Sequence, residues 1–228
     1  GTSLWALHHL GAPLTQATLY EHDPHWQPLL ETLRQHMDFS QENLHLKTAD
    51  ISRLTQLPNA DLVTLSYVLG ELNDTDQQTL VEKAYKAAQK YLVIVTPGTP
   101  AHFTALKGLR EYLVEKEAFI VAPCTHEKAC PLTPDNWCHF CVKVMRSPLH
   151  RQVKNTPHPF ELEKYSYLIV SNEPHTRPAA RILRAPSKHA GHIIFDLCTV
   201  TGQHAMTITR KDKAIWKGAK KAMWGEGI

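Results

Sequence analysis

The sequence predicts an α/β fold in which a doubly wound parallel sheet carries helices and a smaller β-rich unit follows. Strand and helix patterns alternate from residue 2 to residue 117, and the segments at 61–68 and 91–95 are mostly apolar, as buried strands are. Beyond about residue 176 the pattern becomes short and β-rich. We therefore expect a main domain at 1–175 and a β-rich extension at 176–228.

The first half of the chain supplies the alternating elements. Helices are expected at 2–10, 24–37, 74–90 and 104–117, and strands at 17–21, 44–47, 61–68 and 91–95. Pro24 suits the first turn of a helix. The helix at 74–90 begins with acidic residues and ends with lysines, as the helix dipole favours.

The second half of the chain has a different pattern. A strand at 119–122 leads into a group of cysteines, and the segment 147–160, rich in proline, histidine and basic residues, predicts a loop. A strand follows at 165–170. Segments 193–198 and 204–209 alternate in polarity around Thr201, Gly202 and Gln203, which predicts a hairpin.

Composition and charge narrow the class of protein. With 228 residues, 43% of them hydrophobic, the chain can form one large domain with a small appendage. Its longest apolar run, 91–95, is too short to span a bilayer. Net charge is −5 over residues 1–100 and +8 over 101–228. The basic half suggests an anionic partner such as nucleic acid, and a merely solvated basic surface is the alternative.

Four of the five cysteines lie close together in the sequence, at Cys124, Cys130, Cys138 and Cys141, and Cys198 follows far downstream. A chain of this size needs no disulfide framework. Thiolates in such a group predict a metal site, and both zinc and iron–sulfur clusters usually take four ligands.

Spacing alone favours a local ligand set. Cys138 and Cys141 form a CxxC pair, the best chelate in the chain, and the four clustered cysteines would suit zinc. His126 and His139 are further zinc ligand candidates. The alternative for each is a loop histidine held by a hydrogen bond.

Residues at the expected carboxyl ends of strands indicate a nucleotide-containing cofactor. Gly1 opens a helix as the last glycine of a phosphate- or carboxylate-binding loop would, and Glu21 ends a strand where an acid commonly binds ribose hydroxyls. Asp50 is placed to accept from an adenine amine, and Ser66 lies near the end of the next strand. Helix capping is the alternative role for each acid.

Several segments, in order along the chain, resemble one protein family. They read LVTLSYVLGEL (62–72), VTPGTPAHF (95–103), VAPCTHEKACPL (121–132), WCHF (137–140) and KYSYLIV (164–170), and the chain ends in WGE at 224–226. Together they resemble the Rsm-type family of methyltransferase-like proteins of the small ribosomal subunit, found in mitochondria and bacteria. The opening GTSLWAL resembles the end of that family's glycine-rich S-adenosylmethionine loop, so we expect the first strand to be missing from this chain.

The resemblance implies a Rossmann-like S-adenosylmethionine methyltransferase fold with a cysteine-rich metal insertion at 124–141 and a small C-terminal β extension. It implies a 4Fe–4S cluster held by Cys124, Cys130, Cys138 and Cys198, with Cys141 spare and zinc as the alternative metal. It also implies S-adenosylmethionine as a cofactor and rRNA and proteins of the small ribosomal subunit as partners. The location would be the bacterial cytoplasm or the mitochondrial matrix of a eukaryote.

Catalytic residues are not identified by the sequence. The Asn/Asp-Pro-Pro-aromatic motif of amine methylases is absent. Pro123-Cys124 resembles the dipeptide of cytosine-C5 methylases, but a metal-bound thiolate cannot attack a base. Glu71 is a candidate base, with helix capping as the alternative. The sequence therefore supports cofactor binding better than turnover.

These observations favour a small-subunit assembly or translation factor that binds rRNA and an iron–sulfur cluster. An active rRNA methyltransferase and an iron–sulfur redox or sensor protein are the alternatives. The basic residues expected to contact RNA phosphates are Lys143, Arg146, Arg151, Lys154, Arg181 and Arg184.

Overall fold

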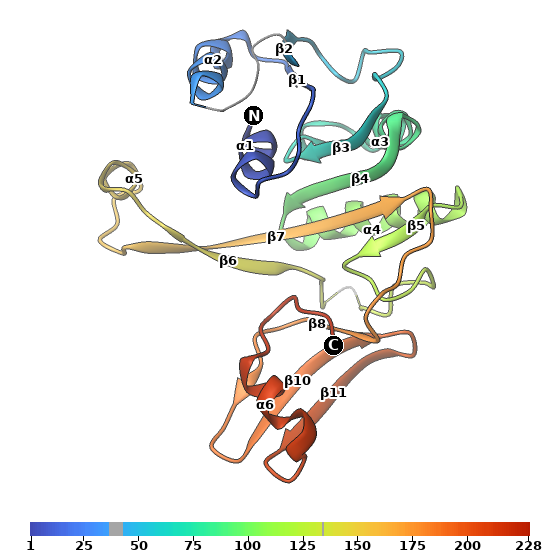
Figure 1. The fold of residues 1–228 in the computed structure, drawn as a ribbon, viewed down its shortest axis with the longest axis vertical. Coiled ribbons are helices and arrows are strands. Elements are labelled where there is room, and N and C mark those ends of the chain that lie inside the picture. Colours follow the sequence, from blue (N-terminus) through green and yellow to red (C-terminus); the bar gives the residue numbers. More distant parts are fainter. Residues whose placement is uncertain (37–42, 134) are drawn as a thin grey trace.

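The computed structural model describes residues 1–36, 43–133 and 135–228. Its described strands form three sheets, one of two, one of five and one of four strands. Figure 1 shows the five-stranded main sheet at the centre, with the small N-terminal sheet on one side and the C-terminal sheet on the other.

The N-terminal part contains α1 (Thr2–His9), β1 (Ala17–Glu21), the 3₁₀ helix η1 (Pro24–Trp26), α2 (Gln27–Gln35) and β2 (Leu44–Thr48). β1 and β2 are parallel, and their leucines pack with Leu4 of α1 in a small core. The elements predicted here are confirmed, except that the expected helix end at Met37 lies outside the described residues.

The main sheet contains β3 (Ala60–Ser66), β4 (Ala88–Pro97), β5 (Phe119–Ala122), β6 (Phe140–Met145) and β7 (Phe160–Ser171). The strand order is β3-β4-β7-β5, with β6 paired to β7. β3 and β4 are parallel, whereas β7 is antiparallel to β4, β5 and β6. The prediction of a parallel sheet is therefore correct for β1–β2 and β3–β4 only, because β7 runs antiparallel to each of the strands beside it.

The strand order is that of a doubly wound fold. In such a fold the first strand lies between the second and the fourth. β1, β2 and β3 have the second, third and fourth places of that order, yet β1 and β3 belong to different sheets. Within the described residues, the place of the first strand is not filled.

Helices α3 (Asp74–Ala87) and α4 (Pro100–Glu115) pack on the main sheet and, with the short η3 (Leu69–Glu71), bury the largest core. Asn73 caps α3 and Thr99 caps α4, each by accepting a hydrogen bond from a backbone N–H. α3 ends before the predicted Lys90 because the chain passes directly into β4 at Ala88.

The C-terminal sheet contains β8 (Ala180–Ile182), β9 (Ser187–Lys188), β10 (His192–Thr199) and β11 (Gly202–Thr209), and α6 (Lys213–Lys221) packs on it. The predicted hairpin is confirmed as β10–β11. After α6 the chain returns to β8, where the N–H of Gly225 donates to the Ile182 carbonyl and the N–H of Ile228 to that of Ala180.

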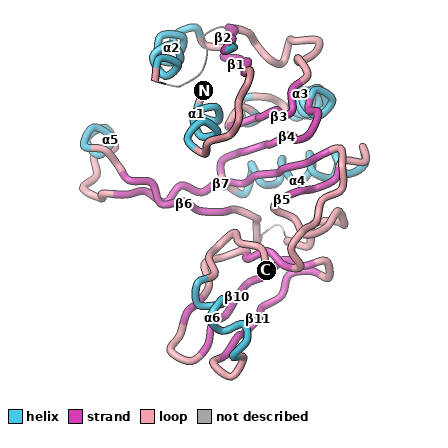
Figure 2. The backbone as a smooth tube through the Cα atoms, viewed as in Figure 1, coloured by secondary structure: helices cyan, strands magenta, loops and turns pink. Residues whose placement is uncertain are grey.

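The predicted loop at 147–160 contains a helix. α5 (Pro148–Val153) begins after Ser147, whose hydroxyl accepts the N–H of His150, and it connects β6 to β7. Figure 2 shows this connection far from the rest of the molecule. None of the described helices has the length and apolarity needed to cross a membrane.

Candidate functional site

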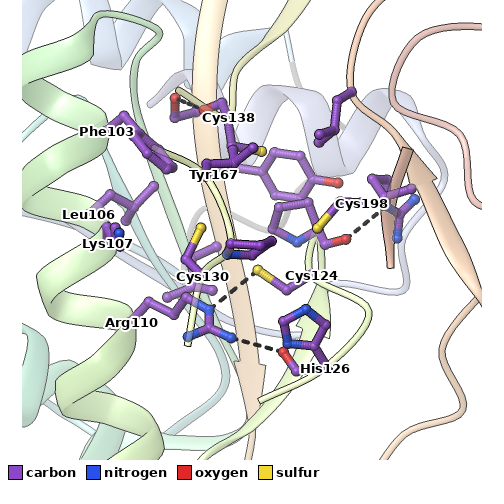
Figure 3. Close-up of a pocket in the computed structure, with 17 residues that line it drawn as sticks. Phe103, Leu106, Lys107, Arg110, Cys124, His126, Cys130, Cys138, Tyr167 and Cys198 are labelled. Atoms are coloured by element: carbon purple, nitrogen blue, oxygen red, sulfur yellow. Dashed lines mark hydrogen bonds between the residues drawn. The ribbon is translucent and has the colours of Figure 1, made fainter. Parts of the chain in front are cut away.

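Four of the five cysteines line one pocket between the main sheet and the C-terminal sheet (Figure 3). Cys124 follows β5, Cys130 and Cys138 lie in the loop before β6, and Cys198 lies on β10. Side chains of α4 and β7 complete the wall, among them Phe103, Leu106, Arg110, Tyr167 and Leu168. The pocket is thus formed jointly by both parts of the chain.

Packing holds three of these cysteines together. Cys130, Cys138 and Cys198 form an apolar cluster with Leu132 and Leu183. Cys198 lies opposite Arg181 of β8 in the sheet register, and its side chain is buried. The thiols from the loop and from the extension are therefore brought together by ordinary hydrophobic burial.

Burial also controls the acidity of the thiols. It raises the pKa of Cys124, raises that of Cys138 well above its usual range and raises that of Cys198 to about 12. The negative charges of neighbouring thiolates, Cys124 and Cys130 among them, raise the last two pKa values further. Burial therefore favours the protonated form of Cys124, Cys138 and Cys198, and a bound metal would displace those protons.

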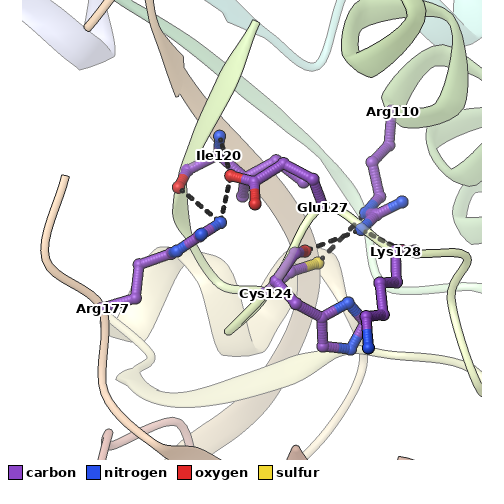
Figure 4. Close-up of polar contacts among 7 residues, drawn as sticks. Arg110, Ile120, Cys124, Glu127, Lys128 and Arg177 are labelled. Carbon is purple, nitrogen blue, oxygen red and sulfur yellow. Dashed lines mark hydrogen bonds and ion pairs between the residues drawn. The ribbon is translucent and has the colours of Figure 1, made fainter. Parts of the chain in front are cut away.

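Arg110 of α4 is buried beside the pocket (Figure 4). Its Nε donates to Cys124 Sγ at 3.3 Å, and its Nη2 donates to the carbonyls of His126 and Lys128 at 2.9 and 2.7 Å. Among the described residues, no carboxylate forms an ion pair with it. A guanidinium stays charged, so the pocket holds a buried positive charge beside a potential thiolate.

The predicted metal insertion is a thiol-lined pocket and not a ready-made ion site. In the described ranges, no group of three or more His, Cys, Asp or Glu side chains is arranged to hold a metal ion. A single zinc ion would draw four sulfurs to about 2.3 Å from one point. An iron–sulfur cluster spreads its four cysteine ligands over separate irons. The pocket supplies four thiols around one space, with the Arg110 guanidinium beside Cys124, and this donor set matches the four cysteine ligands of a cluster.

Two of the ligand candidates suggested by spacing lie outside the pocket. Cys141 lies on β6 opposite Lys164 and does not line the pocket. His139 stacks on Trp137 with ring centroids 4.7 Å apart and also lies outside it. His126 does line the pocket, and neither of its buried ring nitrogens has a hydrogen-bond partner.

The predicted cofactor residues lie where the parallel strands end. Gly1 is the N-cap residue of α1, and Glu21 is the last residue of β1. Glu21 Oε1 accepts the N–H of Asp23 at 3.1 Å, and Asp50 accepts from the N–H and hydroxyl of Ser52. The hydroxyl bond lowers the pKa of Asp50. Ser66 is the exposed last residue of β3, in a different sheet.

Three of the arginines expected to contact RNA make contacts within the protein. Arg146 binds Glu161 at 2.9 Å and is mostly buried. Arg181 donates to the carbonyls of Pro123 and Gly225 at 2.8 and 3.0 Å. Arg184 donates to the carbonyls of Leu183 and Trp137 and to the side chain of Asn136. The contacts of Arg181 and Arg184 join the cysteine loop, β8 and the C-terminal tail.

The remaining cations are more accessible. Arg151 is partly buried in α5, Lys154 is exposed, and the exposed Lys143 places its ammonium 4.0 Å from the ring centre of Phe160. α6 contains no acidic residue and presents four exposed lysines, at 213, 217, 220 and 221.

Arg110 is a pocket residue that no sequence motif indicates. The feature of the sequence that could have indicated it is a charged side chain within the apolar stripe of α4, whose buried members are Leu106, Leu109 and Leu113. A charge at a core-facing helical position indicates a buried polar partner.

The fold and the pocket define the class of protein. It is a doubly wound α/β domain with a β extension, and cysteines from both parts line one pocket. The sequence matches the family described as Mitochondrial small ribosomal subunit Rsm22 over residues 1–228, and the chain belongs to that family.

Curated relatives cover only part of this chain and extend well beyond it. The human protein "Ribosome assembly protein METTL17, mitochondrial" is 28% identical in an alignment 183 positions long that covers 73% of this chain and 39% of the relative. "Rsm22-cox11 tandem protein 2, mitochondrial" of Schizosaccharomyces pombe is 25% identical in an alignment 179 positions long that covers 59% of this chain and 24% of the relative. The chain therefore spans less than half the length of these relatives.

Solved structures of similar fold include a putative methyltransferase from Thermoplasma acidophilum, with a TM-score of 0.48 and 11% identity over 77% of this chain and 66% of that one. TehB from Haemophilus influenzae has a TM-score of 0.46 and 12% identity over 74% of this chain and 53% of that one.

Proposed function

We propose that this chain is the cluster-binding and RNA-binding part of an assembly factor for the small ribosomal subunit. In this proposal Cys124, Cys130, Cys138 and Cys198 hold a 4Fe–4S cluster that joins the extension to the methyltransferase-like domain. The supporting observation is the pocket, to which both parts of the chain contribute thiols while Cys141 stays outside. Membership of the Rsm22 family supports the ribosomal role.

The chain's own residues give the cluster a structural task. Three thiols come from the main domain and one from β10, so the ligands clamp the extension in place. Arg110 offsets negative charge at Cys124, and the leucines around Cys198 exclude water. When bound, the cluster supplies four metal–thiolate bonds, and it is also able to transfer an electron.

Metal analysis of anaerobically purified variants tests the ligand set. Cys198→Ser removes the only proposed ligand from the extension, so we expect iron content to fall well below that of the wild type. Cys141→Ser is the matched control, because Cys141 lies outside the pocket, and we expect its iron content to be unchanged. One zinc and no iron in the wild type would refute the cluster, and metal loss in Cys141→Ser alone would favour the local set.

Metal removal should act on one part of the molecule. We expect chelation to speed amide exchange in β10 and β11, whose attachment depends on the cluster, and to leave β3 and β4 unchanged. Hydrogen exchange followed by mass spectrometry measures both regions in one sample. Equal exchange with and without metal would show that the extension needs no cluster to stay attached.

S-adenosylmethionine is the proposed second ligand, bound at the strand ends near Gly1, Glu21, Asp50 and Ser66. The supporting observation is that Glu21 ends β1 and Ser66 ends β3, while Asp50 follows β2. Calorimetry on the full-length protein tests this. Absence of binding heat at millimolar S-adenosylmethionine would show that the protein has the methyltransferase-like fold without binding the cofactor. Methylation of small-subunit rRNA by the same protein would convert the assembly factor into an active methyltransferase.

RNA binding is proposed for the basic surface of α6, together with Arg151 and Lys154. The lysines of α6 are exposed and meet no acid within the helix. The curated relatives have mitochondrial names, and we propose the mitochondrial matrix as the location for a eukaryotic source and the cytoplasm for a bacterial one.

A further inference from the structure

β6, α5 and the first half of β7 form an arm that extends away from the rest of the molecule (Figures 1 and 2). β6 pairs with residues 160–165 of β7, whereas β4 pairs with residues 165–171. The arm is therefore a two-stranded ribbon with α5 at its tip. A ribbon of two strands has no core of its own and exposes both faces.

One face of this ribbon continues a buried face of the main sheet. Ser166, Leu168 and Val170 alternate along β7, are all buried, and the last two pack in the core that α4 covers. Side chains two residues apart share a face of a strand. The same face therefore continues outward through Lys164, Leu162 and Phe160.

The continuation stays apolar where the helix no longer covers it. Leu162 is 60% exposed and Phe160 38%, and Met145, directly opposite Phe160 on β6, is 68% exposed. We call Lys143, Met145, Phe160, Leu162 and Lys164 the arm face. At the tip, Leu149 and Val153 of α5 are 68% and 76% exposed. Neighbouring exposed apolar side chains of this kind mark an interaction site.

Charge on the ribbon is divided between its faces. Lys143 and Lys164 flank the apolar centre of the arm face. Glu161 and Glu163 lie on the opposite face, with Val144 and Val142 as their partners, and Glu161 is bound by Arg146. A complementary surface would be apolar at its centre with carboxylates at its rim.

The arm face is better suited to protein than to RNA. Leucine and methionine side chains offer nothing to phosphates, and RNA-binding platforms rely on open aromatic rings for base stacking. The one aromatic ring here, Phe160, has the Lys143 ammonium 4.0 Å from its centre, so that side of the ring is covered.

We propose that the arm face docks onto a protein with an apolar patch rimmed by acidic residues. The proposed function identifies that partner as a protein of the small ribosomal subunit. In this arrangement the ribbon holds the ribosomal protein while the basic residues elsewhere contact RNA.

Site-specific photo-crosslinking on purified small ribosomal subunits tests the assignment with the full-length protein. A benzophenone amino acid replaces Leu162 in one sample and Glu163, exposed on the opposite face, in the control. We expect position 162 to crosslink to one ribosomal protein and position 163 to give much less of that product. Crosslinks from 162 to rRNA, to the same chain or to a second copy would overturn the proposal.

Binding measurements separate this inference from the proposed function. We expect the double substitution Met145→Ser and Leu162→Ser to weaken binding to small subunits about tenfold, as loss of central apolar contacts does, and to leave binding to protein-free rRNA unchanged. Val142→Ser, exposed on the other face, is the control. If the double variant binds subunits as the wild type does, the docking proposal fails alone. If the wild type does not bind subunits, the proposed function fails and the docking proposal with it.

Discussion

At the scale of single residues, Arg110 sets the electrostatics of the pocket. It is 4% exposed, it makes three hydrogen bonds, and within the described chain it has no carboxylate partner. A buried charge without a counter-ion is costly. Thiolates bound to metal would supply the missing negative charge, so burying the Arg110 charge costs less in the cluster-loaded protein than in the metal-free one.

Arg110→Leu should therefore affect the metal-free and the metal-bound protein differently. We expect the metal-free variant to be about as stable as the wild type. Removing a buried charge that has no counter-ion is favourable, and this offsets the loss of the hydrogen bonds that Arg110 donates to Cys124 and to two backbone carbonyls. We expect the loaded variant to lose its iron faster. Urea unfolding of metal-free protein and the rate of iron release to a chelator measure the two effects. Equal iron release from both proteins would remove Arg110 from the proposed site.

Glu127 and Arg177 form an ion pair that ties the cysteine loop to the segment before β8 (Figure 4). Burial opposes ionisation of Glu127, but the Arg177 hydrogen bond and the N–H of Ile120 outweigh it and lower the pKa of the carboxyl. A lowered folded-state pKa stabilises the fold above the unfolded value of about 4.3, and this contribution is lost as pH falls through the folded-state pKa.

Glu127→Gln should therefore cost about 1 kcal/mol of unfolding free energy at pH 7, and the difference from the wild type should shrink below about pH 4. Urea unfolding at pH 7, 5 and 3 measures it, because only the last value lies well below the unfolded pKa of about 4.3. A difference that is as large at pH 3 as at pH 7 would mean that the charge of Glu127 does not stabilise the fold.

At the scale of elements, the C-terminal tail is held by close backbone packing. Gly225 has φ of +90°, and a Cβ atom there would lie 3.0 Å from the ring of Phe140. Its carbonyl accepts from Arg181, and its N–H donates to β8. The tail therefore connects β8 with the beginning of the arm.

Gly225→Ala should destabilise the protein by about 1–3 kcal/mol, because alanine must adopt a strained backbone against a fixed ring. Gly108→Ala is the control: Gly108 lies inside α4, where an added Cβ would meet no atom within 4 Å, and there alanine should stabilise by about 0.5–1 kcal/mol. Thermal unfolding of both variants measures the two changes in stability, which we expect to have opposite signs. Stabilisation by both substitutions would show that the tail tolerates a side chain at 225.

Elements with a strong period or an apolar run can be predicted from sequence, as α3, β4 and the β10–β11 hairpin show. α5 is short, and its only sequence signal is the Ser147-Pro148 pair, a cap followed by proline at the first turn. β6 escapes prediction because only its first residue, Phe140, is buried, and the apolar residues that follow are exposed or half-buried and show no core pattern.

At the scale of the whole molecule, spacing could not have selected the site. Cys138 and Cys141 are neighbours in sequence, yet the fold separates them, because β6 begins between them and Cys141 becomes a strand residue. Cys198 reaches the pocket only through the docking of the C-terminal sheet, which is a long-range contact. The family resemblance indicates Cys198, which lines the pocket, whereas chelate spacing favours Cys141, which does not line it.

The division of charge along the chain gives a prediction at this same scale. The lysines at 213, 217 and 221 recur every four residues, so they form one stripe along the exposed side of α6. If each contacts one phosphate, replacing all three with glutamine should lower the slope of log affinity against log salt by about 2, at roughly 0.7 for each phosphate of single-stranded RNA. Titrations of small-subunit rRNA at several salt concentrations measure that slope.

The control for this stripe is a triple glutamine variant at Lys86, Lys90 and Lys116, which removes the same charge elsewhere. Lys86 and Lys90 already pair with Glu82 and Asp61. A long-range effect of net charge would weaken RNA binding in both variants alike, whereas direct phosphate contact changes the slope only for the α6 variant. Equal slopes for the wild type and the α6 variant would remove α6 from the RNA interface and leave Arg151 and Lys154 as the candidates to reverse next.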